Sequence, residues 1–506
     1  MIRRTLKIAL VLVALTLVAN VTAQGRADEL RIGWEQGQTF DSIMGNLVNE
    51  NAVMYQVYIA LVRLETGGAG IVPDLATEWE LSEDGLDYTF TLREGVTWHN
   101  GYGEIRAQDV VNHFERVLDP ETLSPFRSTL DGVEEVRAVD DYTVAFRLSE
   151  PDAFFLNRIA VNAGLISNTE AVAEFGEDYG RNPVSAGPYI FREWMPGQYV
   201  LLEANPEYYG GEPKTKYVRF VHIPDESARR IALETGQVDI FWNATDPIMV
   251  ESFERAPGFE VHSIVATNLV GPFINTKIAP FDDVRVRQAM AYAIDYEGIV
   301  EGVRGGLATK PVSHIPAGLF GHTDEVRQYD YDPERARELL AEAGYPNGFE
   351  TTIGVLNSGY TPDMFAVIQS NFRDVGINLR VQLQDPPTWA NSLATGNVPM
   401  AVLLHTSNNP DHLLTRFFYG PSCVPAGSNF SCWDGADDLI REARSELDEE
   451  RRTQIYAEIQ SRLMEELPLI PVLSNLQIDI TSSRVQNYVK GLFFEADLRE
   501  VVLEER

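Results

Sequence analysis

Two kinds of hydrophobic spacing alternate along this chain and restrict it to a mixed architecture of helices and strands. In the first kind, apolar residues occupy every second position, as is typical of strands buried on one face only. Two such runs are present, one at Leu86, Tyr88, Phe90 and Leu92 and the other at Tyr142, Val144, Phe146 and Leu148. Both runs are predicted to be half-buried strands.

The second kind of spacing is helical, and the predicted helices have clear first and last residues. Asp332 and Pro333 fit the cap and first position of a helix that ends before Gly344. Two more amphipathic helices, separated near Leu447, are predicted within residues 437–466. Because helices and strands alternate without an internal repeat, the chain is expected to have an α/β or α+β architecture.

Two further helices are predicted together with the residues that they bury. A helix over residues 225–236 is expected to turn Ala228, Ile231 and Ala232 inward. Another starts at Asp282 or Asp283, and its inward side chains are expected to be Val286, Ala289, Met290 and Ala293.

Size and charge limit the classes of partner. The chain has 506 residues, enough for about three compact units. It carries 75 acidic residues against 41 lysines and arginines, a formal net charge of −34. A field of this sign repels phosphate backbones and anionic lipid, so we expect no nucleic-acid partner and no direct membrane binding.

The N-terminus has the parts of a secretory signal peptide. Basic residues at positions 3, 4 and 7 precede an apolar run over 8–19, and the small residues Val21 and Ala23 fit a cleavage site. A membrane-spanning helix needs about 20 apolar residues, so this run is too short for an anchor. We expect residues 1–23 to be removed, with Ala27 as an alternative cleavage site, and the mature protein to be periplasmic.

The chain has two cysteines, Cys423 and Cys432, in a segment rich in Gly, Pro and Ser. Outside the cytoplasm they are predicted to form a disulfide. No histidine lies near them at ligand spacing, which disfavours zinc. Since Cys423 lies far from the signal peptide, we expect no lipoprotein anchor.

Sequence signatures of the common enzyme classes are missing from the chain. It contains no GxSxG, HExxH, GxxxxGK[ST] or GxGxxG segment. The closest histidine pairs, His314 with His322 and His405 with His412, are too far apart for two ligands on one helix. No metal, cofactor or catalytic residue is therefore expected.

A series of motifs extends over about residues 28–500. In chain order they are VPDLATEWE (72–80), YTFTLR (88–93), VTWHNG (96–101), SAGPY (185–189), NPEYYGG (205–211), GQVDI (236–240), PFDDVRVRQA (280–289) and ARELLAEAGYP (336–346). In this order and at these separations they resemble the family 5 extracellular solute-binding proteins of ABC transporters, the dipeptide- and oligopeptide-binding group.

The resemblance implies an α/β fold of the periplasmic-binding-protein type, class II, in which two lobes enclose a solute between them. Lobe one would carry an extra subdomain, and the chain would cross between the lobes near residues 268–275 and 471–475. The implied ranges are 28–56, 176–265 and 476–506 for lobe one, 57–175 for the subdomain, and 266–475 for lobe two.

The resemblance also points to solute-binding positions. In dipeptide-binding relatives an aspartate captures the solute's ammonium group; Asn409 matches it here, and Asp411 follows two residues later. The stretch 355–363, where relatives place a carboxylate-binding arginine, has none. These differences favour a longer peptide, an opine-like conjugate or a less charged solute over a dipeptide.

Other candidates follow from position in the family pattern. Asn51 and Tyr55 open the first helix of lobe one, Asn243 follows the Val-Asp-Ile strand, and Asn268 lies at the first crossing. Trp389 is expected just before a helix of lobe two. His405 is a candidate too, and for a metal-chelate solute His405 or His412 would contact the complex.

The expected function is therefore a monomeric periplasmic receptor that delivers a small or peptide solute to an ABC permease and its ATPase, and that meets the membrane only through the permease. Alternatives within the family are a nickel-type metal chelate or a glycoside as solute. An alternative from another class is a secreted hydrolase with a pair of carboxylates.

Overall fold

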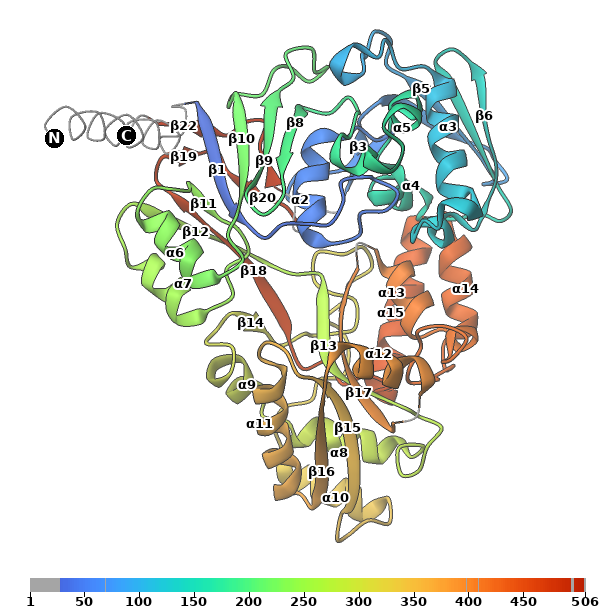
Figure 1. Ribbon diagram of the computed structural model, residues 1–506. Helices are drawn as coiled ribbons and strands as arrows, with labels where there is room; N and C mark the ends of the chain where they lie inside the picture. Colours follow the sequence, from blue (N-terminus) through green and yellow to red (C-terminus); the bar gives the residue numbers. More distant parts are fainter. Residues whose placement is uncertain (1–27, 69, 397, 408, 493–495, 505–506) are drawn as a thin grey trace, which may run out of the picture.

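The computed structural model describes residues 28–68, 70–396, 398–407, 409–492 and 496–504, so the predicted signal peptide lies outside the described residues. These residues form two lobes, an upper lobe that holds the large sheet and a lower lobe built on a second sheet (Figure 1). Among them, no helix has the length and apolar character needed to cross a membrane.

An eight-stranded sheet forms the centre of the upper lobe, in the order β12-β18-β11-β1-β10-β9-β8, with β14 paired to β18. The strands are β1 Glu29–Trp34, β8 Tyr189–Met195, β9 Tyr199–Ala204, β10 Tyr217–His222, β11 Ile240–Phe241, β12 Phe259–Val265, β14 Ala308–Thr309 and β18 Ser474–Ser482. Strand β1 is buried throughout and parallel to both neighbours. Its buried charges are paired, Arg31 with Asp239 at 3.0 Å and Glu29 with Arg219 at 2.9 Å, which offsets the cost of burying them.

A four-stranded antiparallel sheet, β4-β5-β7-β6, forms a second core of the upper lobe. The strands are β4 Ala76–Leu81, β5 Asp87–Leu92, β6 Val133–Asp140 and β7 Thr143–Leu148. Strand β5 buries Tyr88, Phe90 and Leu92 in alternation, which confirms the period-two prediction. Strand β7 buries the predicted Val144, Phe146 and Leu148, and Ala145 between them is buried too. Helices α2 (Val48–Val57), α3 (Ala107–Leu118), α4 (Phe155–Ile159), α5 (Thr169–Phe175), α6 (Glu226–Glu234) and α7 (Pro247–Glu254) complete this lobe.

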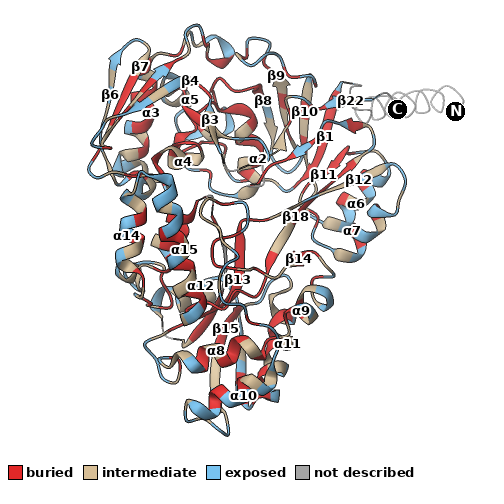
Figure 2. Cartoon of the chain, turned by 180° about the vertical axis from the view of Figure 1, so that it is seen from behind, coloured by how far each residue is buried: buried red, intermediate tan, exposed pale blue. Residues whose placement is uncertain are grey.

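The lower lobe contains the sheet β13-β17-β15-β16. The strands are β13 Asn268–Ile274, β15 Phe349–Leu356, β16 Ile377–Gln384 and β17 Met400–Thr406. The helices are α8 (Val284–Ala293), α9 (Tyr296–Gly302), α10 (Pro333–Glu342), α11 (Thr361–Asp374), α12 (Pro386–Thr395), α13 (Pro410–Phe417), α14 (Asp437–Ser445) and α15 (Glu449–Glu466). Strand β13 is buried along its whole length (Figure 2).

Short paired strands occupy the remaining segments. They are β2 Val62–Leu64 with β3 Ile71–Pro73, β19 Val485–Gln486 with β22 Val502–Leu503, and β20 Val489–Lys490 with β21 Ala496–Asp497. Tyr189, part of the SAGPY motif, is fully buried and donates a hydrogen bond to the backbone of Leu498 at 3.1 Å, so this motif has a packing role.

Most helix predictions are confirmed. Asp332 caps α10, Asp283 caps α8, and α14 and α15 are separate helices. The predicted inward face of α6 is wrong at two positions, because Ala228 and Ile231 are exposed. The buried residues of α6 are Arg229, Ala232 and Leu233.

The chain passes between the two sheets at two neighbouring places, from β12 into β13 and from the end of α15 into β18. The crossing segments are hydrogen-bonded to each other: Val270 N–H donates to the Leu473 carbonyl and Val472 N–H to the Val270 carbonyl, both at 2.9 Å. At Gly271 a Cβ atom would lie 2.0 Å from the Ile470 carbonyl oxygen, so this close approach requires glycine. The residue ranges predicted for the lobes stay a prediction.

Candidate functional site

A cavity of about 320 Å³ lies where side chains of both lobes meet. From the upper lobe come α2, the loop before it and the segments around Phe126 and Asn162; from the lower lobe come the end of β17 and the start of α13. The lining residues are Asn46, Val48, Asn51, Tyr55, Phe126, Thr129, Arg158, Val161, Asn162, Ala163, Thr406, Ser407, Asn409 and His412.

The lining is rich in neutral polar groups. Four asparagines and three hydroxyl residues face the cavity, with Tyr55 and Phe126 as aromatic surfaces, and no carboxylate is among its described lining residues. Asn162 donates from Nδ2 to Oδ1 of Asn51 at 2.9 Å, which fixes two of the amides against each other. Such a surface can recognise a solute through hydrogen bonds and contacts with aromatic rings.

The start of α13 is set by the sequence Asn-Pro. The side chain of Asn409 accepts a hydrogen bond from the backbone N–H of His412 at 2.8 Å, and Pro410 occupies the first helical position. Both residue types are favoured at these helix positions. The amide of Asn409 therefore holds the helix start in place at the edge of the cavity.

Arg158 is the one charged residue of the described lining apart from the titratable His412, and it joins the two lobes. Its Nε donates to Oδ2 of Asp152 at 2.7 Å, and its Nη2 pairs with Oδ2 of Asp411 on α13. All three side chains are nearly buried, with 10%, 12% and 2% exposure for Arg158, Asp152 and Asp411. Burial lowers the pKa of Arg158, but the two carboxylates outweigh it, so the pKa is raised and the guanidinium stays charged.

His412 is a neutral group in this site. Burial, followed by the positive charges of Arg416 and Arg158, lowers its pKa to about 4. The neutral His412 therefore adds no positive charge to the cavity.

Three of the residues predicted from the sequence line the cavity: Asn51, Tyr55 and Asn409. Asn268 is buried at the crossing, where its Oδ1 accepts a hydrogen bond from the backbone N–H of Asn475 at 3.0 Å. Asn243 has a left-handed backbone with φ of 58°, and its N–H donates to Oδ1 of Asp479 at 2.8 Å. Neither Asn243 nor Asn268 is among the lining residues.

The remaining predicted residues are placed differently. Trp389 lies inside α12 and not before it, and its Nε1 donates to the Val402 carbonyl at 3.1 Å. His405 is in β17, but its side chain lies outside the described part of the structure. Asp411 is almost fully buried against Arg158 and does not belong to the described lining, so a direct contact with solute stays a prediction.

Sequence reasoning missed most of the lining, including Arg158 and Asn162. A signal was present, because Arg158 interrupts the apolar segment AFFLNRIAVNA over 153–163, and a charge in such a run is usually buried with a partner. The pattern alone does not reveal that this partner, Asp411, comes from the other lobe.

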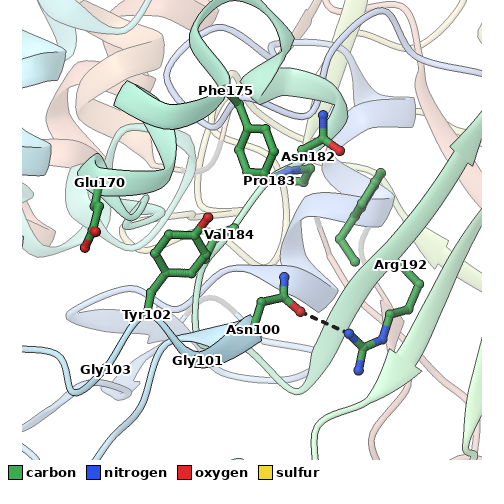
Figure 3. A pocket seen from close by; sticks show the side chains of 11 residues that line it. Asn100, Gly101, Tyr102, Gly103, Glu170, Phe175, Asn182, Pro183, Val184 and Arg192 are labelled. Carbon is green, nitrogen blue, oxygen red and sulfur yellow. Dashed lines mark hydrogen bonds between the residues drawn. The ribbon is translucent and has the colours of Figure 1, made fainter.

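A larger hollow, of about 760 Å³, opens on the surface of the upper lobe (Figure 3). It is bordered by the turn around Gly101 and by Phe175, Asn182 and Arg192, and Arg192 donates to Oδ1 of Asn100 at 3.0 Å. Its lining contains none of the residues predicted for solute binding and none from the lower lobe, so the smaller cavity between the lobes is the better candidate site.

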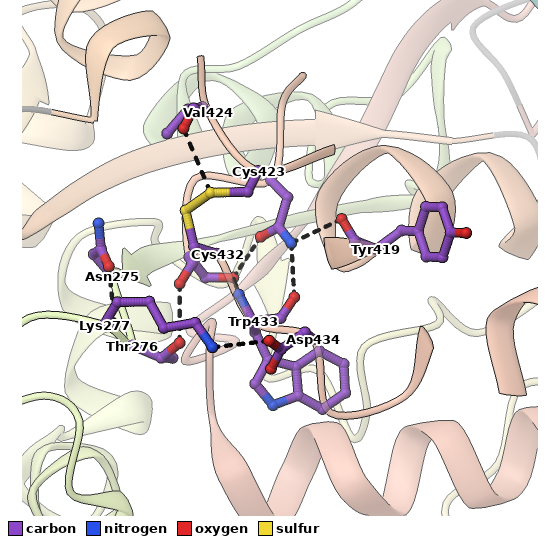
Figure 4. The surroundings of a disulfide bond; sticks show 11 residues. Asn275, Thr276, Lys277, Tyr419, Cys423, Val424, Cys432, Trp433 and Asp434 are labelled. Atoms are coloured by element: carbon purple, nitrogen blue, oxygen red, sulfur yellow. Dashed lines mark hydrogen bonds and ion pairs between the residues drawn. A yellow bond between two sulfur atoms is a disulfide. The ribbon is translucent and has the colours of Figure 1, made fainter. Parts of the chain in front are cut away.

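The predicted disulfide between Cys423 and Cys432 is present, with their Cα atoms 4.6 Å apart (Figure 4). It closes a loop of the lower lobe beside the end of β13. There Lys277 pairs with Asp434 at 3.0 Å and Thr276 N–H donates to the Ser431 carbonyl at 2.9 Å. Within the described residues, no three His, Cys, Asp or Glu side chains are grouped so as to hold a metal ion.

Two lobes around a polar cavity, joined by a pair of hydrogen-bonded crossing segments, define the class of two-lobe periplasmic solute receptors. Comparison with known proteins identifies the family within this class. The model of the bacterial extracellular solute-binding proteins, family 5, middle region, matches residues 70–422, and the chain belongs to this family.

Individual relatives can be aligned with this chain over most of its length. Heme-binding protein A of Haemophilus influenzae is 30% identical, with 88% of this chain and 86% of that protein aligned. The dipeptide-binding protein of Escherichia coli is 28% identical, with 96% and 95% aligned. The structure of MoaA from A. tumefaciens in complex with mannopinic acid has a TM-score of 0.78 and 29% identity, over 94% of this chain and 99% of that one.

Members of this family are transport receptors that act outside the cytoplasm, and they deliver solutes to an ABC permease. The protein is accordingly a solute receptor and not an enzyme, and the hydrolase alternative is not supported.

Proposed function

We propose that the protein captures a peptide or an opine-like solute in the cavity between its lobes and presents it to an ABC permease and its ATPase. The observation that supports this is the lining: amides, hydroxyls and aromatic rings from both lobes face one cavity. A solute held there contacts both lobes at once, so its binding favours the closed arrangement that a permease can distinguish from the empty one.

The lining also favours one part of this solute class. Capture of a dipeptide's ammonium group calls for an accessible carboxylate. Asn409 stands at that position, and the carboxylate of Asp411 is occupied by Arg158. Longer peptides and opine-like conjugates, which offer amides, hydroxyls and carboxylates, suit the cavity better than dipeptides.

The remaining parts of the proposal concern the whole chain. Residues 1–23 act as a cleaved signal, the mature protein is a periplasmic monomer without a lipid anchor, and it meets the membrane only through the permease. The lobes follow the predicted ranges, with 57–175 as the subdomain and 266–475 as lobe two.

Native mass spectrometry of the purified mature protein, followed by calorimetry, tests the proposed solute class. The panel holds tri-alanine, longer peptides, mannopinic acid, hemin, a disaccharide and nickel-histidine. We expect a peptide or mannopinic acid to bind, and Asn51→Leu to weaken that binding by about tenfold or more, because it removes polar contacts inside the cavity.

Asn182→Leu, in the surface hollow of the upper lobe, is the matched control and should leave the affinity unchanged. Binding of nickel-histidine or the disaccharide alone would replace the proposed solute with one of the alternatives. Equal losses in both variants would contradict the placement of the solute in the cavity.

A further inference from the structure

Arg158 has hydrogen-bonding capacity that the protein does not use. Its Nε and Nη2 are bonded to Asp152 and Asp411, but Nη1 has no bonding partner among the described residues, although Arg158 lines the cavity. A nearly buried guanidinium that keeps one N–H group open to the cavity can donate a charge-assisted hydrogen bond to an acceptor on a solute.

The two carboxylates are held in place by further bonds of their own. Oδ1 of Asp152 accepts from the backbone N–H of Phe154 at 2.9 Å, and Oδ1 of Asp411 accepts from the hydroxyl of Thr415 at 3.2 Å. Neither carboxylate belongs to the described lining. They therefore position the guanidinium and leave one edge of it for the solute.

The lining beside Arg158 supplies a further donor. Arg416 and Arg158 contribute to the lowered pKa of His412, whereas the charge of Arg158 itself is offset by Asp152 and Asp411. Beside Arg158, the amide of Asn51 lines the same cavity; its oxygen accepts from Asn162, and no described residue bonds its Nδ2. A second donor is thus available to a carboxylate oxygen.

We propose that Arg158 is the specificity-determining residue of this receptor and that it binds a carboxylate of the solute through Nη1, with Asn51 as a second donor. This inference rests on the proposed function. An ammonium-capturing site prefers a positive group of the solute, whereas this site would prefer a negative one. The recognising residue, Arg158, belongs to the upper lobe. Its Nε is held by Asp152, and its Nη2 is held by Asp411 of the lower lobe.

The test compares probes in which one charged group at a time is neutralised. Tri-alanine, its C-terminal amide and its N-acetyl form are titrated calorimetrically into the wild-type protein, together with mannopinic acid and its methyl ester. We expect the acids to bind at least about tenfold more tightly than the amide or ester, as is typical for the loss of a charge-assisted hydrogen bond. N-acetylation should change the affinity much less.

The same titrations with Arg158→Gln and Arg158→Lys identify the residue responsible. Arg158→Gln should lose the preference for the acids and keep its affinity for the amide, whereas Arg158→Lys, which retains the charge, should keep part of the preference. The comparison of acid, amide and ester in the wild-type protein needs no substitution. It therefore tests the preference for a carboxylate even if Arg158→Gln fails to fold.

Three results would overturn the inference. One is a larger loss from N-acetylation than from amidation in the wild type. Another is an equal loss for acid and amide in Arg158→Gln. The third is that no peptide or mannopinic acid binds at all, which removes the proposed function itself and is distinguishable from binding without charge preference.

Discussion

At Asp411 a single carboxylate of the lower lobe is bonded to a guanidinium of the upper lobe. Its exposure is only 2%, and its two oxygens are shared between Arg158 and Thr415. Removing one partner of a buried ion pair leaves a charge without compensation, although Asp152 still holds Arg158 here.

Asp411→Ala is therefore expected to lower the free energy of unfolding by roughly 2–3 kcal/mol, below the usual cost of breaking a buried pair because Asp152 remains. Asp411→Asn keeps the shape and one acceptor and should cost less. Urea denaturation of the two variants measures the difference, and a wild-type midpoint for Asp411→Ala would show that the pair contributes nothing.

The family pattern led to Asn51, Tyr55 and Asn409, and all three line the cavity, whereas their contact with a solute stays a prediction. Arg158 could not be found in this way, because its role depends on a contact with Asp411 that is 253 residues away along the chain. Periodicity describes neighbours within an element and carries no information about such a contact.

The segment before α4 links the two lobes through two adjacent phenylalanines. Phe154 is buried in the core of the lower lobe, 6.0 Å from Phe320 and 6.1 Å from Tyr456 between ring centroids. Phe155 is buried in the core of the upper lobe, 4.8 Å from Tyr88. Neighbouring residues of one segment thus stabilise different lobes.

Phe154→Ala and Phe155→Ala should consequently have different effects on shape. Each removes a buried aromatic ring and is expected to cost about 3–5 kcal/mol. Only Phe154→Ala should also move the lobes apart in the solute-free protein, because only Phe154 bridges them. Spin labels at Glu135→Cys and Glu338→Cys, both exposed, report the distance, and an unchanged distance in Phe154→Ala would contradict the bridging role.

Element prediction worked where caps and periodicity agree, as in α10 and in strands β5 and β7. It failed for the inward face of α6 because Arg229 is counted as polar in the pattern. In the structure Arg229 is 8% exposed, its guanidinium lies 5.2 Å from the ring centroid of Phe241, and it donates to the Ile223 carbonyl at 3.1 Å. A long apolar stem whose head group bonds a backbone carbonyl and lies over an aromatic ring can occupy a position that the pattern assigns to an apolar residue.

For the molecule as a whole, three buried histidines link folding to pH. Burial is the main cause that lowers the pKa values of His99, His113 and His314 to about 4. In the unfolded chain histidine titrates near 6.5, so between about pH 6.5 and 4 the unfolded state binds more protons. Stability is fully present above this window and is lost as the pH falls through it.

Denaturation curves at pH 7, 6, 5 and 4.5 should accordingly show a steep loss of stability toward acid. Each histidine contributes a slope of up to about 1.4 kcal/mol per pH unit. His314→Gln removes one such group and should flatten the slope by that amount, whatever its effect at pH 7. Identical slopes in the variant and the wild type would refute the assignment.

The paired crossing segments decide how the lobes can move. Two backbone strands bonded side by side resist sliding, since a slip would break the bonds of Val270 with Val472 and Leu473 together, whereas bending across the pair leaves those bonds intact. The connection is therefore expected to bend in one direction more easily than in any other. We therefore expect the lobes to open by a swing about a single axis, which would give the solute one route into the cavity and the permease one series of shapes between empty and loaded receptor.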